Sequence, residues 1–228
     1  IKEMDYVAEN FKDKVLDTVY IGGGTPTTLE PEQLDRLITA LKSKFDFSTV
    51  KEFTVEAGRA DSITREKLEV LHRHQVSRIS VNPQTMKQET LDIIGRKASV
   101  EQVLTAYRLA REVGFDNINM DLILGLPGEL EAGVQRTIEK IVELAPDSLT
   151  VHSLAIKRAS RLNQWIQENG VSMLHNTDET MKIAAAGAEK LGMKPYYLYR
   201  QKNMSGNFET TGYARPGKYG LYNILIME

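Results

Sequence analysis

Alternating strand-like and helical segments restrict the possible folds of this chain more than any other feature. Apolar side chains recur at helical spacing between short apolar runs, and helices separate each run from the next. Strands connected in this way form right-handed βαβ units on a parallel sheet. A doubly wound sheet and a (β/α) barrel both fit this α/β pattern, and paired helices after the third and fifth strands favour the barrel. The expected strands cover residues 17–21, 52–56, 78–81, 118–124, 148–154 and 195–199.

The chain has the size and composition of one globular domain, which we assign to residues 1–228. Of its 228 residues, 41% are hydrophobic and 26% are charged, and no linker or low-complexity stretch divides them. A net charge of −2 without a basic tract argues against a nucleic-acid partner. No apolar run approaches the roughly 20 residues of a membrane-spanning helix, and no signal peptide is visible. We therefore expect a cytoplasmic protein.

Both ends of the chain look interrupted. The sequence begins at Ile1 within a helical stripe that continues to Val15, and it ends in the apolar run 221–228, which is typical of a strand. We interpret the chain as a piece of a longer protein with further sequence at both ends. Cysteine is absent from the sequence, so the chain has no disulfide, thiolate metal site or cysteine nucleophile of its own.

Three consecutive glycines follow the first strand. Gly22, Gly23 and Gly24 lack Cβ atoms, so their backbone N–H and C=O groups can contact a ligand directly. Thr25 adds a hydroxyl beside them, and Pro26 fixes the backbone at the exit. Taken alone, the run favours a simpler interpretation, a tight loop against which a large group packs. It becomes a candidate binding site because other polar residues are expected at the same edge of the sheet.

Polar side chains occur where the predicted strands end, which is the edge at which parallel sheets and barrels bind ligands. Glu56 ends the second strand, Gln84 follows the third, and Ala155 follows the fifth, three residues after His152. Asp121 interrupts an otherwise apolar strand, so its carboxylate must be hydrogen-bonded or neutral. A structural role and a ligand-binding role fit it equally well. These residues predict a small polar ligand with ribose-like hydroxyls or an ammonium group.

Three motifs in succession resemble those of a known family. Residues 20–27 (YIGGGTPT) resemble the GGGTP motif of radical S-adenosylmethionine (SAM) enzymes. Residues 78–85 (RISVNPQT), Arg96 and residues 119–128 (NMDLILGLPG) then follow in an order similar to that of oxygen-independent coproporphyrinogen III oxidases, also called coproporphyrinogen dehydrogenases. The resemblance covers residues 18–154 and, more loosely, the rest. It implies a partial (β/α) barrel of parallel strands, of which this chain is a core fragment.

The resemblance also implies that the candidate residues hold SAM. Backbone groups of the glycine run would hold its methionine end, and Arg96, which the local pattern assigns to solvent, would pair with the methionine carboxylate. Gln84 and Asp121 would contact the ribose, and Ala155 would line the adenine pocket. No catalytic or metal-binding residue is implied within the chain. The implied SAM-binding residues are Gly22, Gly23, Gly24, Thr25, Glu56, Gln84, Arg96, Asp121 and Ala155.

The sequence departs from the family pattern at three places. Ala57-Gly58 stands where the family often has Asp-Pro, and Asn82-Pro83 stands where it often has Gly-Val. The CxxxCxxC motif that binds the family's 4Fe–4S cluster is absent, and we expect it just upstream of Ile1. The C-terminal region that helps to cover the porphyrinogen in the family is also expected outside this chain.

The resemblance implies that the parent protein converts coproporphyrinogen III to protoporphyrinogen IX without oxygen. In the family, a reduced 4Fe–4S cluster cleaves SAM, and a 5′-deoxyadenosyl radical takes hydrogen from a propionate side chain that then loses carbon dioxide. An electron donor such as flavodoxin or ferredoxin would be a partner. The fragment alone would be inactive because it cannot ligate the cluster. Two alternatives stay open, a haem chaperone and a cluster-less barrel that binds SAM or another nucleotide.

Overall fold

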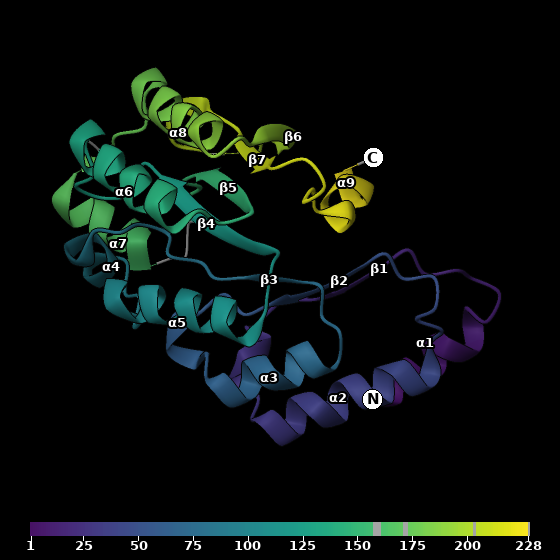
Figure 1. Cartoon of the computed structure of the whole chain (residues 1–228). Coiled ribbons are helices and arrows are strands. Elements are labelled where there is room, and N and C mark those ends of the chain that lie inside the picture. The colour runs from purple at the N-terminus through teal and green to yellow at the C-terminus, as the bar shows by residue number, and fades with distance from the viewer. Residues whose placement is uncertain (157–160, 171–172, 203, 228) are drawn as a thin grey trace.

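A mixed sheet that curls into an open half-barrel forms the centre of the molecule (Figure 1). The computed structural model describes residues 1–156, 161–170, 173–202 and 204–227. Within them, the sheet has seven strands in the order β1-β2-β3-β4-β5-β7-β6. The strands are β1 (Thr18–Ile21), β2 (Glu52–Glu56), β3 (Arg78–Ser80), β4 (Ile118–Leu124), β5 (Ser148–Ser153), β6 (Lys194–Tyr199) and β7 (Thr210–Ala214).

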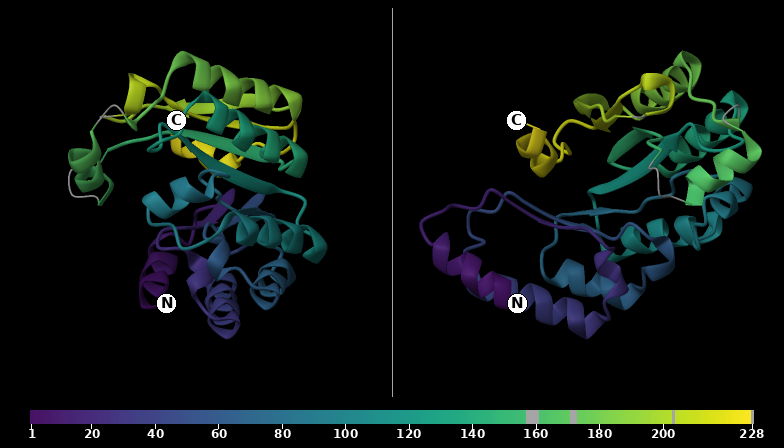
Figure 2. Two further views of the ribbon diagram at one scale, coloured as in Figure 1. Left: turned by 90° about the vertical axis from the view of Figure 1, so that its left-hand side faces the viewer. Right: turned by 180° about the vertical axis from the view of Figure 1, so that it is seen from behind.

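Helices cover the convex side of the sheet and leave much of its concave side open (Figure 2). Strands β1 to β5 are mutually parallel and connected through helices, which confirms the predicted βαβ pattern and the partial barrel. No helix of the described residues is long and apolar enough to cross a membrane. The helices are α1 (Lys2–Asn10), α2 (Pro31–Lys44), α3 (Arg65–Arg73), α4 (Gln88–Ile93), α5 (Val100–Val113), α6 (Glu131–Leu144), α7 (Arg161–Asn169), α8 (Asp178–Lys190) and α9 (Leu221–Met227).

Local sequence signals set the ends of α3 and α5. The Thr64 hydroxyl accepts a hydrogen bond from the Lys67 backbone N–H at the start of α3. Ser99 and Gln102 form a reciprocal capping box at the start of α5, where each side chain satisfies a backbone N–H of the other residue. Gly114 ends α5 with a left-handed φ of 116°, a conformation that costs glycine little. Thr64, Ser99 and Gly114 are residue types that favour these positions at helix ends.

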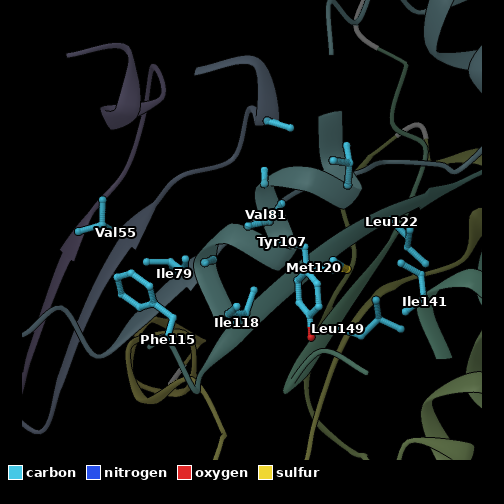
Figure 3. Packing of buried hydrophobic residues seen from close by; sticks show 14 of the residues in the cluster. Val55, Ile79, Val81, Tyr107, Phe115, Ile118, Met120, Leu122, Ile141 and Leu149 are labelled. Carbon is cyan, nitrogen blue, oxygen red and sulfur yellow. The ribbon is translucent and has the colours of Figure 1, made fainter. Parts of the chain in front are cut away.

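The two faces of β4 have different chemistry because side chains alternate across a strand. Ile118, Met120 and Leu122 point to the convex side, where each is at most 1% exposed and packs under the helices (Figure 3). Burying one such side chain contributes about 1.5–3 kcal/mol to folding. Asn119 and Asp121 lie on the opposite, concave face, where Asn119 donates to the Asp121 carboxylate at 2.7 Å. The strand that looks apolar on both sides in sequence therefore has one polar face.

The concave face carries polar side chains on the neighbouring strands as well. Arg78, which is 3% exposed, donates to the Ser148 hydroxyl at 3.3 Å, and Ser148 donates to the Asn119 side-chain oxygen at 2.9 Å. Hydrogen bonds of this kind offset the cost of burying polar groups. The inside of the half-barrel is thus a polar surface rather than a second hydrophobic core.

The structure corrects two expectations for the C-terminal part. Residues 221–227 form α9 instead of a strand, because the Glu52 carboxylate accepts the backbone N–H groups of Leu221 at 2.6 Å and Tyr222 at 3.2 Å. Strand β7 is an additional antiparallel strand that separates β5 from β6. It contains Gly212, at which a Cβ atom would overlap the ring of Tyr197 on β6. That packing requirement interrupts the alternating pattern by which a strand is recognised in sequence.

Candidate functional site

The glycine loop, residues 22–25, lies at the carboxyl end of β1. Gly22, Gly23 and Gly24 are exposed, and a Cβ atom at Gly23 or Gly24 would meet no atom within 4 Å. Gly23 has a φ of 108° and Thr25 a φ of 67°, so the chain turns here through left-handed conformations. The described residues do not pack against the middle of the loop. This open space favours a ligand cradle over a loop that only accommodates packing.

Glu56 joins the glycine loop to the sheet. Its Oε2 accepts the Gly23 backbone N–H at 3.3 Å, and its Oε1 accepts the hydroxyl of Tyr20 on β1. A Cβ at Gly22 would lie 2.6 Å from the Tyr20 ring and 3.0 Å from the Glu56 carboxyl carbon, so glycine is required there for space. Burial of the Tyr20 phenol, and then its hydrogen bond to Glu56, raise the pKa of Tyr20. Tyr20 thus stays a protonated donor to the carboxylate.

Hydrogen bonds to Thr27 hold the chain where it leaves the glycine loop. The Thr27 hydroxyl donates to the Ala57 carbonyl oxygen at 3.2 Å and lies 2.7 Å from the Ser62 hydroxyl. Lys67, which is 8% exposed, donates from Nζ to the Thr27 carbonyl oxygen at 2.8 Å and to that of Ser62 at 3.3 Å. A buried ammonium group with backbone acceptors holds the loop against α3. Sequence reasoning missed Lys67, which looks like an ordinary residue of an amphipathic helix.

A cavity of about 360 Å³ opens at the carboxyl ends of β4 and β5. Asp121 lies in it opposite His152, whose Nε2 is 3.6 Å from the Asp121 Oδ2. Burial raises the pKa of Asp121, but His152 and then Asn119 and Thr150 stabilise the carboxylate, so the pKa is lowered overall. The cavity therefore contains a charged carboxylate. Its lining includes the three predicted residues Gln84, Asp121 and Ala155.

The backbone of Gln84 is built into the sheet beside the cavity. Its N–H donates to the Asp121 carbonyl oxygen at 3.0 Å, and its carbonyl oxygen accepts the Ile123 N–H at 2.9 Å. Gln84 has a φ of 66°, which is uncommon for a residue with a side chain. The two hydrogen bonds to β4 stabilise this conformation and fix where the side chain begins.

Arg96 lies outside the cavity. It follows α4 in a loop and lines a small neighbouring depression with Arg59, Asp61 and Asn82. Burial of the guanidinium and the nearby Arg59 lower the pKa of Arg96, whereas Asp121 and Asp61 act in the opposite direction. Arg96 and Asp121 line different hollows. The structure places Arg96 at the same edge of the sheet as the other candidates.

Several cavity residues were not expected from the sequence. His152 lies on β5 and lines the cavity beside Asp121. Its alternation with Thr150 on the concave face is the signal that would have identified it. Met204 and Thr210 also line the cavity. Thr210 belongs to β7, which was not recognised from the sequence, and Met204 pairs with Ala155 in an isolated antiparallel bridge.

Comparison with known proteins identifies the class. Residues 1–141 match the Radical SAM superfamily, and the chain therefore belongs to that superfamily, whose cofactors are SAM and a 4Fe–4S cluster. The chain is 44% identical over 99% of its length to the oxygen-independent coproporphyrinogen-III oxidase-like protein HemZ of Bacillus subtilis. It is 32% identical over 96% of its length to the haem chaperone HemW of Lactococcus lactis. It spans about half of each relative, 46% and 55% respectively.

The solved structures agree with this assignment. Coproporphyrinogen III oxidase (HemN) from Escherichia coli, described as a radical SAM enzyme, superimposes with a TM-score of 0.76 at 25% identity and covers 94% of this chain, which corresponds to 47% of HemN. Archaeal Elp3 from Methanocaldococcus infernus gives a TM-score of 0.64 over 82% of this chain at 16% identity, a likeness of fold alone. The partial barrel predicted from the sequence is therefore confirmed.

The two cofactors of the superfamily fit these residues differently. The chemistry of SAM matches the groups present: Glu56 contacts the glycine loop, the space above Gly23 and Gly24 is open, and Gln84 and Asp121 line a cavity at the same edge of the sheet. Carboxylate and amide groups of this kind can bind an ammonium group and ribose hydroxyls. The cluster does not fit, since the chain has no cysteine. The described residues also contain no group of three or more His, Cys, Asp or Glu that could hold a metal ion. The described residues therefore offer polar groups suited to SAM but no ligands for the cluster.

Proposed function

We propose that this chain binds SAM at the carboxyl-end edge of the half-barrel, as part of an enzyme that oxidatively decarboxylates coproporphyrinogen III. The proposal is supported by the position of the glycine loop with Glu56 and of the Asp121 cavity, which both lie at the carboxyl ends of the parallel strands of one sheet. The similarity to HemZ over 99% of the chain supports a porphyrinogen as the substrate class. The protein would act in the cytoplasm with an electron donor such as flavodoxin or ferredoxin.

Each candidate group has a defined task in this proposal. The loop N–H and C=O groups and Glu56 bind the polar methionine end of SAM, and Arg96 pairs with its carboxylate. Asp121 stays charged and accepts hydrogen bonds from the ribose hydroxyls, with Gln84 beside it. Ala155 leaves room for the adenine at the cavity wall. Held by these residues, SAM would supply the radical chemistry for removing hydrogen from the substrate, with the electron delivered by a cluster bound outside this chain.

The proposal is tested with the full protein that contains this chain, reconstituted anaerobically with iron and sulfide. Given SAM, a reductant and coproporphyrinogen III, it should release carbon dioxide and form protoporphyrinogen IX, which is quantified as protoporphyrin after oxidation. The Asp121→Asn variant, tested in parallel, should lose most of this turnover. A reconstituted protein that cleaves SAM but leaves coproporphyrinogen III unchanged would refute the substrate assignment.

A haem chaperone is the second candidate function. The 32% identity to HemW over 96% of the chain favours it, since that relative matches the same segment. A chaperone should bind haem stoichiometrically, as measured by the Soret absorption band, and should pass it to an acceptor protein without converting coproporphyrinogen III. The turnover assay and the haem titration together distinguish the two functions.

A further inference from the structure

Tyr20 lies between the glycine loop and the C-terminal helix. The two oxygens of the Glu56 carboxylate have different partners, since Oε1 accepts the Tyr20 hydroxyl and Oε2 accepts the Gly23 N–H. Rotating the carboxylate about its last bond would break both contacts. The Tyr20 hydroxyl therefore determines how Glu56 is presented to the loop.

The ring of Tyr20 is held in turn by α9. It stacks on the ring of Tyr222 with a centroid distance of 4.2 Å and an interplanar angle of 17°. A stacked aromatic pair contributes about 0.5–1.5 kcal/mol beyond its buried area. Tyr222 can occupy this position because the carboxylate of Glu52, 7% exposed, accepts the first backbone N–H groups of α9.

Helix α9 also contacts the far edge of the sheet. The Asn223 side-chain amide donates to the Tyr196 hydroxyl on β6 at 3.2 Å, and the Tyr196 ring lies 5.3 Å from that of Tyr219. Figures 1 and 2 show α9 on the open side of the half-barrel, and it contacts both edge strands, β1 and β6. Tyr222 lies about 200 residues after Tyr20 in the sequence, yet its ring stacks on Tyr20, which holds Glu56 beside the glycine loop.

We infer that Tyr20 is a positioning residue for the SAM site: its hydroxyl orients Glu56 toward the glycine loop, and α9, through Tyr222, fixes the Tyr20 ring. This inference rests on the proposed function, in which Glu56 and the loop contact SAM. A tyrosine with a purely structural role would need only some acceptor for its hydroxyl. Here the acceptor is the one carboxylate, among the described residues, that accepts a hydrogen bond from the loop backbone.

The experiment compares Tyr20→Phe with the wild-type chain. The variant keeps the ring and its stacking but cannot donate to Glu56. We expect solvent exchange of the Gly23 amide proton, followed by NMR without ligand, to become severalfold faster. The Kd for SAM, measured by calorimetry, should rise about threefold to tenfold, as expected for the loss of one hydrogen bond. Tyr213→Phe removes a hydroxyl from a half-buried tyrosine of β7 and should change neither quantity.

A second variant tests the part played by α9. Tyr222→Leu removes the stacked ring and leaves the Tyr20 hydroxyl in place, so it should shift Gly23 exchange and SAM affinity in the same direction by a smaller factor. Amide spectra of residues far from the site, such as those of α6, show whether each variant is folded. If the Gly23 amide exchanges at the wild-type rate in both variants, the inference about Tyr20 and α9 is overturned.

The outcomes separate this inference from the proposed function. Faster Gly23 exchange with unchanged SAM affinity in Tyr20→Phe would overturn the positioning role. The Tyr20 hydroxyl would then stabilise the loop without contributing to SAM binding. If the wild-type chain binds no SAM while Tyr20→Phe still accelerates Gly23 exchange, the proposed ligand is wrong and the structural link is supported. Slower exchange and weaker binding cannot both follow from a loosened loop, so that combination would also contradict the inference.

Discussion

The buried ammonium of Lys67 lies 2.8 Å from the carbonyl oxygen of Thr27, directly behind the glycine loop. A backbone carbonyl at this depth has to be paired, because an unpaired buried polar group costs free energy. Lys67 of α3 thereby ties the chain that leaves the glycine loop to this helix. Lys67, which lies outside the glycine motif, therefore anchors the residue at the exit of the loop.

Replacing Lys67 with methionine should destabilise the chain. Lys67→Met keeps much of the aliphatic length but removes the donor to Thr27, so the free energy of unfolding should fall by about 1–3 kcal/mol. Urea denaturation followed by circular dichroism measures this change. Lys182→Met, at an exposed position of α8, is the matched control and should stay within about 0.5 kcal/mol of wild type. Equal stability of the two variants would mean that water satisfies the Thr27 carbonyl.

Gly24→Ala should separate a ligand cradle from a packing loop. A Cβ atom at Gly24 meets nothing within 4 Å, and Gly24 is not among the glycines with positive φ, so the fold should tolerate alanine. We expect a stability change below about 0.5 kcal/mol but at least a tenfold weaker affinity for SAM, or about 1.4 kcal/mol. Thermal melting and calorimetry measure the two quantities. Undiminished affinity would show that SAM does not approach this part of the loop.

Arg96→Ala should weaken SAM binding without affecting the fold. The side chain lines a surface depression, and the charged pair it would form with the methionine carboxylate is worth about 1.5–3 kcal/mol. The Kd should therefore increase by about one to two powers of ten. Lys97→Ala removes the neighbouring exposed positive charge and serves as the control. If both variants lose affinity equally, the effect is one of general charge and not of a pair at Arg96.

Glu129→Gln should change how stability depends on pH. Glu129 is 2% exposed and accepts a hydrogen bond from Thr85, and burial raises its pKa. A carboxyl whose pKa is raised by folding stabilises the protein fully below its unfolded pKa of about 4.3 and loses that contribution as the pH rises through the folded value. The neutral glutamine avoids this loss, so the stability of the variant relative to wild type should increase as the pH rises above the unfolded value of about 4.3.

Glu131→Gln supplies the comparison of opposite sign. The hydrogen bond from His175 lowers the pKa of Glu131, so this carboxylate stabilises the fold above its unfolded pKa. Removing its charge should reduce stability at neutral pH relative to acid. Urea midpoints measured across the same pH series test both variants. Parallel curves for the two variants would contradict the environments assigned to these carboxyl groups.

The sequence was sufficient for the parallel part of the fold because β1 to β5 and their helices have strong and regular periodicity. The run 221–227 is a helix and not the expected strand. A short, largely apolar run does not distinguish the two in sequence, and the deciding contact is with Glu52, far away in the chain. Strand β7 was missed because glycine at 212, which is needed to make room for the Tyr197 ring, breaks the alternation of apolar and polar side chains that marks a strand in sequence.

The candidate site was predicted in part. Gln84, Asp121 and Ala155 line one cavity, and Glu56 contacts the glycine loop, as expected for residues at one edge of a parallel sheet. Their roles toward SAM stay predictions. Tyr20 and Lys67 could not be found from sequence, because both act through contacts between segments that are distant in the chain.

Strand β1 has four residues and, in the described sheet, pairs only with β2. Its outer side therefore presents backbone donors and acceptors that a strand of another molecule could use, which is the usual origin of edge-to-edge aggregation. A strand this short offers few such groups, and α9 lies against it through Tyr222. The length of β1 therefore limits how firmly a foreign strand would be held at this edge.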